Sequence, residues 1–331
     1  MPLAARTRRL SAASWRDLGL AGLTLVLAVA AALSFPSFAT PANAAHVLDD
    51  TAILIILALG QMLVIVTRAI DLSVAANLAL SGMIAALLGR SYPQLAMPAI
   101  VAAAILSGAL LGAFNGLLVW KLRVPAIVVT LGTMSVYRGA IFLLSKGTWV
   151  NDNEMSSAFL GLVRAELFGL TSLTWLAVAL ASASFVVLRY TNFGRDIYAV
   201  GGNETAAAYA GIDAGWTRFC AFTLCGALAG LCGYLWVARF AVAYTDVALG
   251  FELQVIAACL IGGVAIAGGA GGALGVIVGC LFLGVLKNLL PLIGVSPFWQ
   301  MFVNGVVIIA AALLSGLQQP RKHPIMEPDT R

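Results

Sequence analysis

Long apolar runs constrain the fold of this chain more than any other feature. Each run has about 17–24 residues, the length that a helix needs to cross the hydrocarbon core of a bilayer. Inside lipid the backbone must satisfy its own hydrogen bonds, which leaves only helices or a closed barrel. The runs lack the strict alternation of barrel strands. The sequence therefore predicts an all-α polytopic membrane protein.

Composition leaves no room for a separate soluble domain, because only 10% of the 331 residues are charged and soluble globular domains carry roughly 25%. We expect a single transmembrane domain at 18–315 between short tails at 1–17 and 316–331. It should contain about ten spans, at roughly 18–35, 51–67, 73–89, 97–120, 124–144, 171–189, 215–237, 251–267, 273–290 and 298–315.

The distribution of lysine and arginine predicts the orientation. The side that holds the N-terminal tail also holds most of the other basic residues, including those at 121–123 and 189–195. By the positive-inside rule both termini lie in the cytoplasm. The N-terminal region resembles a signal peptide, but its apolar run is long enough to span, which favours an uncleaved first helix.

One polar stretch, 189–213, lies between two apolar runs and falls on the cytoplasmic side in this orientation. Asn203 and Glu204 are typical of a helix N-terminus, and Gly211 suits a helix end. A short helix in water on the face of a membrane bundle is a candidate docking surface. An ordered connecting loop is the alternative.

A weak internal repeat relates the two halves of the chain. Asp71-Leu72-Ser73-Val74 is similar to Glu252-Leu253-Gln254-Val255, and a glycine follows each acid at the same distance. Glycines spaced four apart should then share one helix face and allow close helix packing; they are Gly108, Gly112 and Gly116 in one half and Gly271, Gly275 and Gly279 in the other. We expect an inverted repeat of roughly five plus five spans, frequent among transporters.

The sequence shows no catalytic machinery and no metal-binding cluster, since its two histidines are far apart in different segments. It also lacks the G-x-x-x-x-G-K-[ST] phosphate cradle, so the chain should not hydrolyse a nucleotide itself. Arg68 and Asp71, three residues apart at a break between spans, are expected to form an ion pair or to serve the path or gate.

Polar groups at membrane depth are candidates for a translocation pathway. They are Asp71, Asn77, Asn115, Thr130, Thr133, Tyr137, Arg138 and Asn304. Hydroxyl and amide groups suit a neutral polyhydroxylated solute, but they also join helices to one another. An ion-coupled secondary transporter would need acidic residues in mid-span, whereas Asp71 and Glu252 lie near span ends. An importer driven by a separate ATPase fits better, and the small residues and the repeat disfavour a non-transporting scaffold.

Several separated motifs resemble the ribose-type permeases of bacterial ABC sugar importers. They are Ala69-Ile70-Asp71-Leu72-Ser73-Val74, 124–134 with Tyr137-Arg138-Gly139, Gly194-Arg195, 199–204 with Ala210-Gly211-Ile212, 252–258, 260–272 and Gln300-Met301. The resemblance covers nearly the whole chain from about residue 50 onward. Two departures stand out: Arg68-Ala69 replaces the glycines that such permeases carry there, and Val74-Ala75 replaces Val-Gly.

The resemblance implies a homo- or heterodimeric permease in the bacterial inner membrane that carries a monosaccharide or related polyol. A periplasmic sugar-binding protein would load it, and an ATPase with two nucleotide-binding cassettes would drive it. ATP and Mg²⁺ would be bound by that ATPase, with no cofactor in this chain. The family's ATPase-coupling segment falls on Gly201, Gly202, Asn203, Glu204, Ala206, Ala207, Ala208 and Gly211.

Overall fold

The computed structural model describes residues 12–296, 299, 302–303, 305–306, 309–310 and 313. Within them, eight helices are long and apolar enough to cross a membrane. They are α1 (Ala12–Ser34), α2 (Pro41–Val66), α3 (Val74–Ser91), α4 (Met97–Lys121), α5 (Ala126–Ser145), α7 (Ser172–Tyr190), α10 (Ala214–Phe240) and α12 (Ala273–Leu292). The predicted all-α polytopic class is confirmed.

Two of the expected spans differ from this set. The span expected at 251–267 is the short helix α11 (Phe251–Ile261), because Gly262 and Gly263 end it. The span expected at 298–315 and Asn304 fall largely or wholly outside the described residues.

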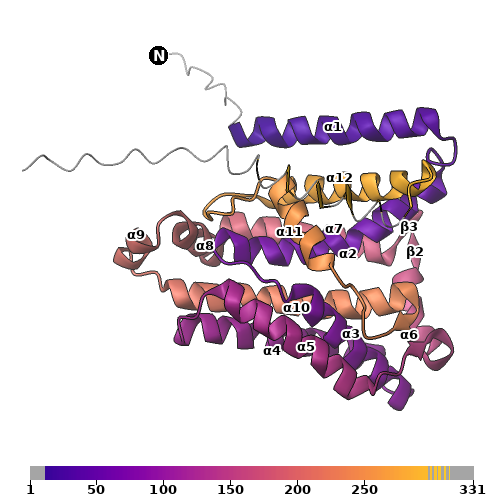
Figure 1. Ribbon diagram of the computed structural model, residues 1–331, viewed down its shortest axis with the longest axis horizontal. Coiled ribbons are helices and arrows are strands. Elements are labelled where there is room, and N and C mark those ends of the chain that lie inside the picture. The colour runs from indigo at the N-terminus through magenta and orange to yellow at the C-terminus, as the bar shows by residue number, and fades with distance from the viewer. Residues whose placement is uncertain are drawn as a thin grey trace, which may run out of the picture.

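Short elements gather at the two ends of the bundle (Figure 1). One end, which we call the α9 end, carries α8 (Asn192–Gly202) and α9 (Glu204–Tyr209). The other, the α6 end, carries α6 (Ser157–Arg164) and a 3₁₀ turn at Asp152–Glu154. Two antiparallel strand pairs, each of two residues per strand, join them there: β1 (Val150–Asn151) with β4 (Val242–Ala243), and β2 (Glu166–Leu167) with β3 (Leu170–Thr171).

Helices α2 and α10 form the centre of the bundle. They pack on each other; α10 also packs on α3 and α4, and α2 on α11 and α12. The central helix of each half thus packs on two helices of the other half, which agrees with the expected inverted repeat. The first helix of each half departs from it, since α1 packs on α12 whereas α7 packs on α2.

The central pair is held at the α6 end by charge. Arg239, at the end of α10, lies 3.4 Å from Asp50 and 3.9 Å from Asp49, both on α2. The buried Asp49 carboxylate also accepts a hydrogen bond from the Thr174 hydroxyl on α7 at 2.8 Å. These bonds fix the start of α2 against two neighbouring helices.

Glycine permits the close contact between α4 and α10. A Cβ atom built on Gly112 would overlap the carbonyl oxygen of Phe222 and lie 2.9 Å from the Cα of Gly226. Gly108 and Gly116 meet the same helix, so the three glycines of the first predicted face lie against α10. Gly275 and Gly279 meet α11 in the same way. Gly271 does not share their face, because it precedes α12 in a loop.

Candidate functional site

The polar stretch forms two helices rather than the single one that the sequence suggested. The Thr191 hydroxyl caps α8, and the Asn203 side chain caps α9 by accepting a hydrogen bond from the Ala206 N–H at 3.1 Å. Gly211, with φ of +83°, ends α9 as predicted, because its conformation is one that a glycine adopts without strain. Nearly all of α9 is exposed at the end of the bundle, including Tyr209 at 90%, while Ala207 is buried.

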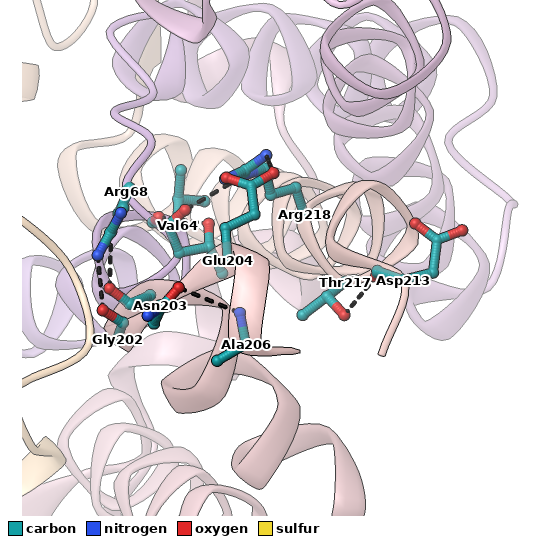
Figure 2. A network of polar contacts seen from close by, with 11 residues as sticks. Val64, Arg68, Gly202, Asn203, Glu204, Ala206, Asp213, Thr217 and Arg218 are labelled. Atoms are coloured by element: carbon teal, nitrogen blue, oxygen red, sulfur yellow. Dashed lines mark hydrogen bonds and ion pairs between the residues drawn. The ribbon is translucent and has the colours of Figure 1, made fainter. Parts of the chain in front are cut away.

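Two arginines tie this pair of helices to the bundle (Figure 2). Arg68 donates from Nε to the Gly201 carbonyl and from Nη2 to the Gly202 carbonyl, each at 2.7 Å. Arg218, on α10, donates to both carboxylate oxygens of Glu204 at 2.9 and 2.6 Å. It also donates to the Thr67 carbonyl at the end of α2, at 3.2 Å. These bonds therefore join the end of α2 and the start of α10 to α8 and α9.

The electrostatics of α9 follow from this contact. Its hydrogen bond with Arg218 holds the pKa of Glu204 below the ordinary value, and partial burial opposes that shift. Glu204 also lies in the first turn of α9, where a negative charge is favoured by the helix dipole.

The expected ion pair between Arg68 and Asp71 is wrong. Arg68 has φ of +67°, which turns its side chain toward α8. The Asp71 carboxylate instead accepts hydrogen bonds from the N–H and the hydroxyl of Ser73, at 2.9 and 2.6 Å. Arg68 thus bonds α8, far along the chain, and Asp71 bonds its near neighbour Ser73.

Three backbone segments meet where α8 ends. A Cβ atom on Gly201 would overlap the Val66 carbonyl oxygen, and that oxygen accepts a hydrogen bond from the Gly269 N–H at 2.9 Å. The Tyr198 hydroxyl of α8 donates to the Gly271 carbonyl at 2.8 Å. The glycine-rich turn at 268–272 therefore lies against α8 and the end of α2. Sequence reasoning identified the turn but not this contact.

A pocket of about 900 Å³ opens beside α9. The connection between α4 and α5 forms one wall with Trp120, Arg123 and Ile127, and Glu204 and Arg218 contribute to the other.

Most of the candidate pathway residues form one buried cluster between α3, α4 and α5. Asn115 donates to the Ser73 hydroxyl at 2.8 Å, and the Tyr137 hydroxyl lies 3.2 Å from Asn115 Oδ1. The Thr130 hydroxyl donates to the Ile70 carbonyl at 3.3 Å. Further members are Asp71, Asn77 and Thr133, all buried. Their donors bond one another or helix carbonyls, as helix-joining polar groups do, whereas Oδ2 of the buried Asp71 has no hydrogen-bond partner among the described residues.

Arg138 lies apart from this cluster. It donates to the Val247 carbonyl at 2.7 Å, in the segment between β4 and α11. Among the residues that the structure describes, no three His, Cys, Asp or Glu side chains gather closely enough to hold a metal ion.

Comparisons with known proteins agree with this architecture. Residues 43–312 match the family model described as "Branched-chain amino acid transport system / permease component". The ribose import permease protein RbsC of Escherichia coli K12 is 39% identical over 305 residues, which covers 91% of this chain and 93% of that protein. The autoinducer 2 import system permease protein LsrC of Klebsiella pneumoniae is 37% identical over 281 residues, covering 85% and 80%. No solved structure matches.

Proposed function

The chain belongs to the family of transport-system permease components that its residues 43–312 match, and from this premise we propose that it is the membrane-spanning subunit of an ATP-driven ABC importer for a monosaccharide or related polyol. A permease component is not an enzyme, and ATP is hydrolysed by a separate ATPase subunit. The chain itself is a multi-pass membrane protein.

The observation that carries the proposal is the full-length similarity to a ribose import permease, over 91% of this chain and 93% of the relative. The autoinducer 2 import permease is nearly as similar, at 37% identity. The family description mentions branched-chain amino acids, whereas these relatives are named for ribose and autoinducer 2. We therefore favour a sugar-like cargo over an amino acid.

The proposed partners follow from this role. They are an ATPase with two nucleotide-binding cassettes, a periplasmic sugar-binding protein and a second permease copy or paralogue. The protein would lie in the bacterial inner membrane with both termini in the cytoplasm. ATP and Mg²⁺ would be held by the ATPase and not by this chain.

We propose α8 and α9 as the element that docks on the ATPase. The proposal is supported by the exposure of α9 at the end of the bundle and by the two arginines that join this helix pair to α2 and α10. The residues involved would be Gly201, Gly202, Asn203, Glu204, Ala206, Ala207, Ala208 and Gly211. Closure of the cassettes would displace this pair and switch the permease between access states.

For the solute, we propose a pathway along α5. The buried cluster fixes one face of α5 through Thr130 and Tyr137, while Gly132 and Gly139 leave open space on the other face. A second permease copy would cover that face. In this proposal the candidate pathway residues set the position of α5, and Arg138 fixes its far end.

Uptake into membrane vesicles tests the proposal. The vesicles contain the permease and the ATPase, and the binding protein loaded with labelled ribose is on the opposite side of the membrane from the ATPase. Ribose should cross only when ATP is supplied on the side that holds the ATPase. Uptake that persists without ATP and collapses with an ionophore would show an ion-coupled secondary transporter instead. A panel of pentoses, hexoses, deoxy sugars, polyols and leucine, offered to the binding protein, would identify the cargo class.

The docking role is tested by Glu204→Lys, which places a cation opposite Arg218. We expect the variant to reach the membrane in normal amounts and to lose ATP-driven uptake. Tyr209→Ala is the reference variant: it also changes an exposed residue of α9, but among the described residues the Tyr209 side chain makes no hydrogen bond or ion pair that the change would remove. Normal uptake by Glu204→Lys would contradict the docking role.

A further inference from the structure

Arg68 occupies a backbone position that glycine holds at the ends of three other described helices with the same hydrogen bonds. Helices α2, α9, α11 and α12 end in the same pattern of hydrogen bonds, in which two successive N–H groups turn back to the last helical turn. The residue at the left-handed position is Gly211 after α9, Gly263 after α11 and Gly294 after α12, with φ of +83°, +82° and +77°. After α2 it is Arg68, with φ of +67°.

A side chain at this position is unfavourable for the backbone, so its contacts must account for it. Both contacts go to the end of α8, where Arg68 bonds the Gly201 and Gly202 carbonyls. The last carbonyls of a helix have no partner within the helix, and a cation there is favoured by the helix dipole. From the end of α2, Arg68 thus donates hydrogen bonds to the last carbonyls of α8, which a glycine in its place could not do.

The segment that follows Arg68 leads into the buried cluster. The Ile70 carbonyl accepts a hydrogen bond from Thr130 on α5, and Asp71 is bonded to Ser73, which in turn accepts from Asn115 on α4. The segment from Arg68 to Ser73 therefore has α8 bonded at one end and α4 and α5 bonded along its length.

We propose that Arg68 is a positioning residue that latches α8 and α9 to the break between α2 and α3, so that a displacement of this helix pair reaches α4 and α5. The latch is a feature of the permease by itself, whereas its use in transport rests on the proposed function. If Arg68 couples these elements, then removing its bonds must let α8 and α9 move independently of the break between α2 and α3.

Arg123 supplies a matched control. It also has a positive φ, +54°, is exposed at the α9 end and lines the same pocket as Arg68. Within the part of the chain that the structure describes, it makes no hydrogen bond or ion pair. Arg68→Gly and Arg123→Gly therefore remove the same charge and the same backbone strain, but only the first removes a contact between helices.

The first experiment measures the position of α9 in the purified permease in lipid nanodiscs, without partners. Spin labels at Tyr209→Cys and Val128→Cys, both exposed positions, report the distance between α9 and α5. Cys220, the half-buried native thiol, is replaced by serine. Arg68→Gly should widen the distance distribution about twofold, because one end of α8 is released, and Arg123→Gly should leave it unchanged. Equal widths in Arg68→Gly and the parent protein would overturn the latch.

The second experiment measures labelled ribose imported per ATP hydrolysed by the complete importer. Arg68→Gly should lower this ratio about threefold or more with unchanged permease in the membrane, and Arg123→Gly should keep it. Arg68→Lys should be intermediate, because an ammonium group cannot match the fork of a guanidinium. An unchanged ratio in Arg68→Gly would overturn the coupling role. If the parent complex imports no sugar, the proposed function fails, and the distance measurement still decides the latch.

Discussion

Gly112→Ala should destabilise the protein although alanine is the better helix former. The added methyl group would overlap the Phe222 carbonyl oxygen and lie 2.9 Å from Gly226 Cα, where ordinary contact begins at 3.4 Å. Both obstacles are backbone atoms of α10 and cannot rotate away, so α4 and α10 must separate. Between helices in lipid, van der Waals packing supplies the attraction that such a separation weakens.

The magnitude follows from two opposing effects. Overpacking by a methylene group costs about 1–3 kcal/mol, and replacing glycine by alanine inside a helix returns about 1 kcal/mol. We expect a net loss of up to about 2 kcal/mol in the free energy of unfolding. Gly132→Ala on α5, where a Cβ atom meets nothing within 4 Å, should only receive the helical gain. The two variants should thus differ by the overpacking cost alone, about 1–3 kcal/mol, on the order of five- to a hundred-and-fiftyfold in the folded-to-unfolded ratio.

Thermal unfolding in detergent, followed by size-exclusion chromatography of the heated sample, measures this difference. The expected order of stability is Gly132→Ala, then the parent protein, then Gly112→Ala. A Gly112→Ala variant as stable as Gly132→Ala would refute the reasoning from close packing. The double variant with Gly226→Ala should lose less than the sum of the single losses, because the first methyl group already separates the helices.

Three further predictions concern the α9 end and the buried cluster. The hydrogen bond with Arg218 keeps the pKa of Glu204 low, so the hold of this ion pair on α9 is complete above about pH 4.3 and is lost as the pH falls through the lower folded value. The protection factors of the α9 amides, which correct for the intrinsic pH dependence of hydrogen exchange, should fall there and should show no such change in Glu204→Gln. Gly201→Ala should displace α8 from the Val66 carbonyl and raise protease cleavage between α8 and α9, with Gly202→Ala, an open position, as control. Tyr137→Phe removes the hydroxyl bonded to α4 and should lower the unfolding free energy by about 1 kcal/mol, read by thermal unfolding.

Local chemistry made much of the fold predictable. The apolar runs expected at 97–120 and 273–290 agree with α4 (Met97–Lys121) and α12 (Ala273–Leu292) within two residues. The cap at Asn203 was also correct, because a cap depends on a few neighbouring residues. Hydropathy alone missed the first turns of α2 (Pro41–Val66), which carry Asp49 and Asp50 and are held by distant side chains.

Contacts between residues far apart along the chain could not be predicted from the sequence. The partner of Arg68 lies 133 residues away along the chain, so the nearby Asp71 was the natural but wrong expectation. The close seating of α8 depends on Gly201, where a Cβ atom would overlap the Val66 carbonyl oxygen, a contact that exists only in the folded bundle. For the same reason the sequence grouped Arg138 with the buried cluster, although it bonds the Val247 carbonyl elsewhere.

The glycine contact between α4 and α10 also has a consequence for the time course of biosynthesis. The two faces are separated by roughly a hundred residues, which a ribosome needs on the order of 5–20 s to add. During that interval α4 lies in the bilayer with a grooved glycine face and without its partner. The nascent permease therefore depends on shielding of this groove by lipid or an insertion factor until α10 emerges, and variants that slow synthesis between α5 and α10 should be degraded more than their folded stability predicts.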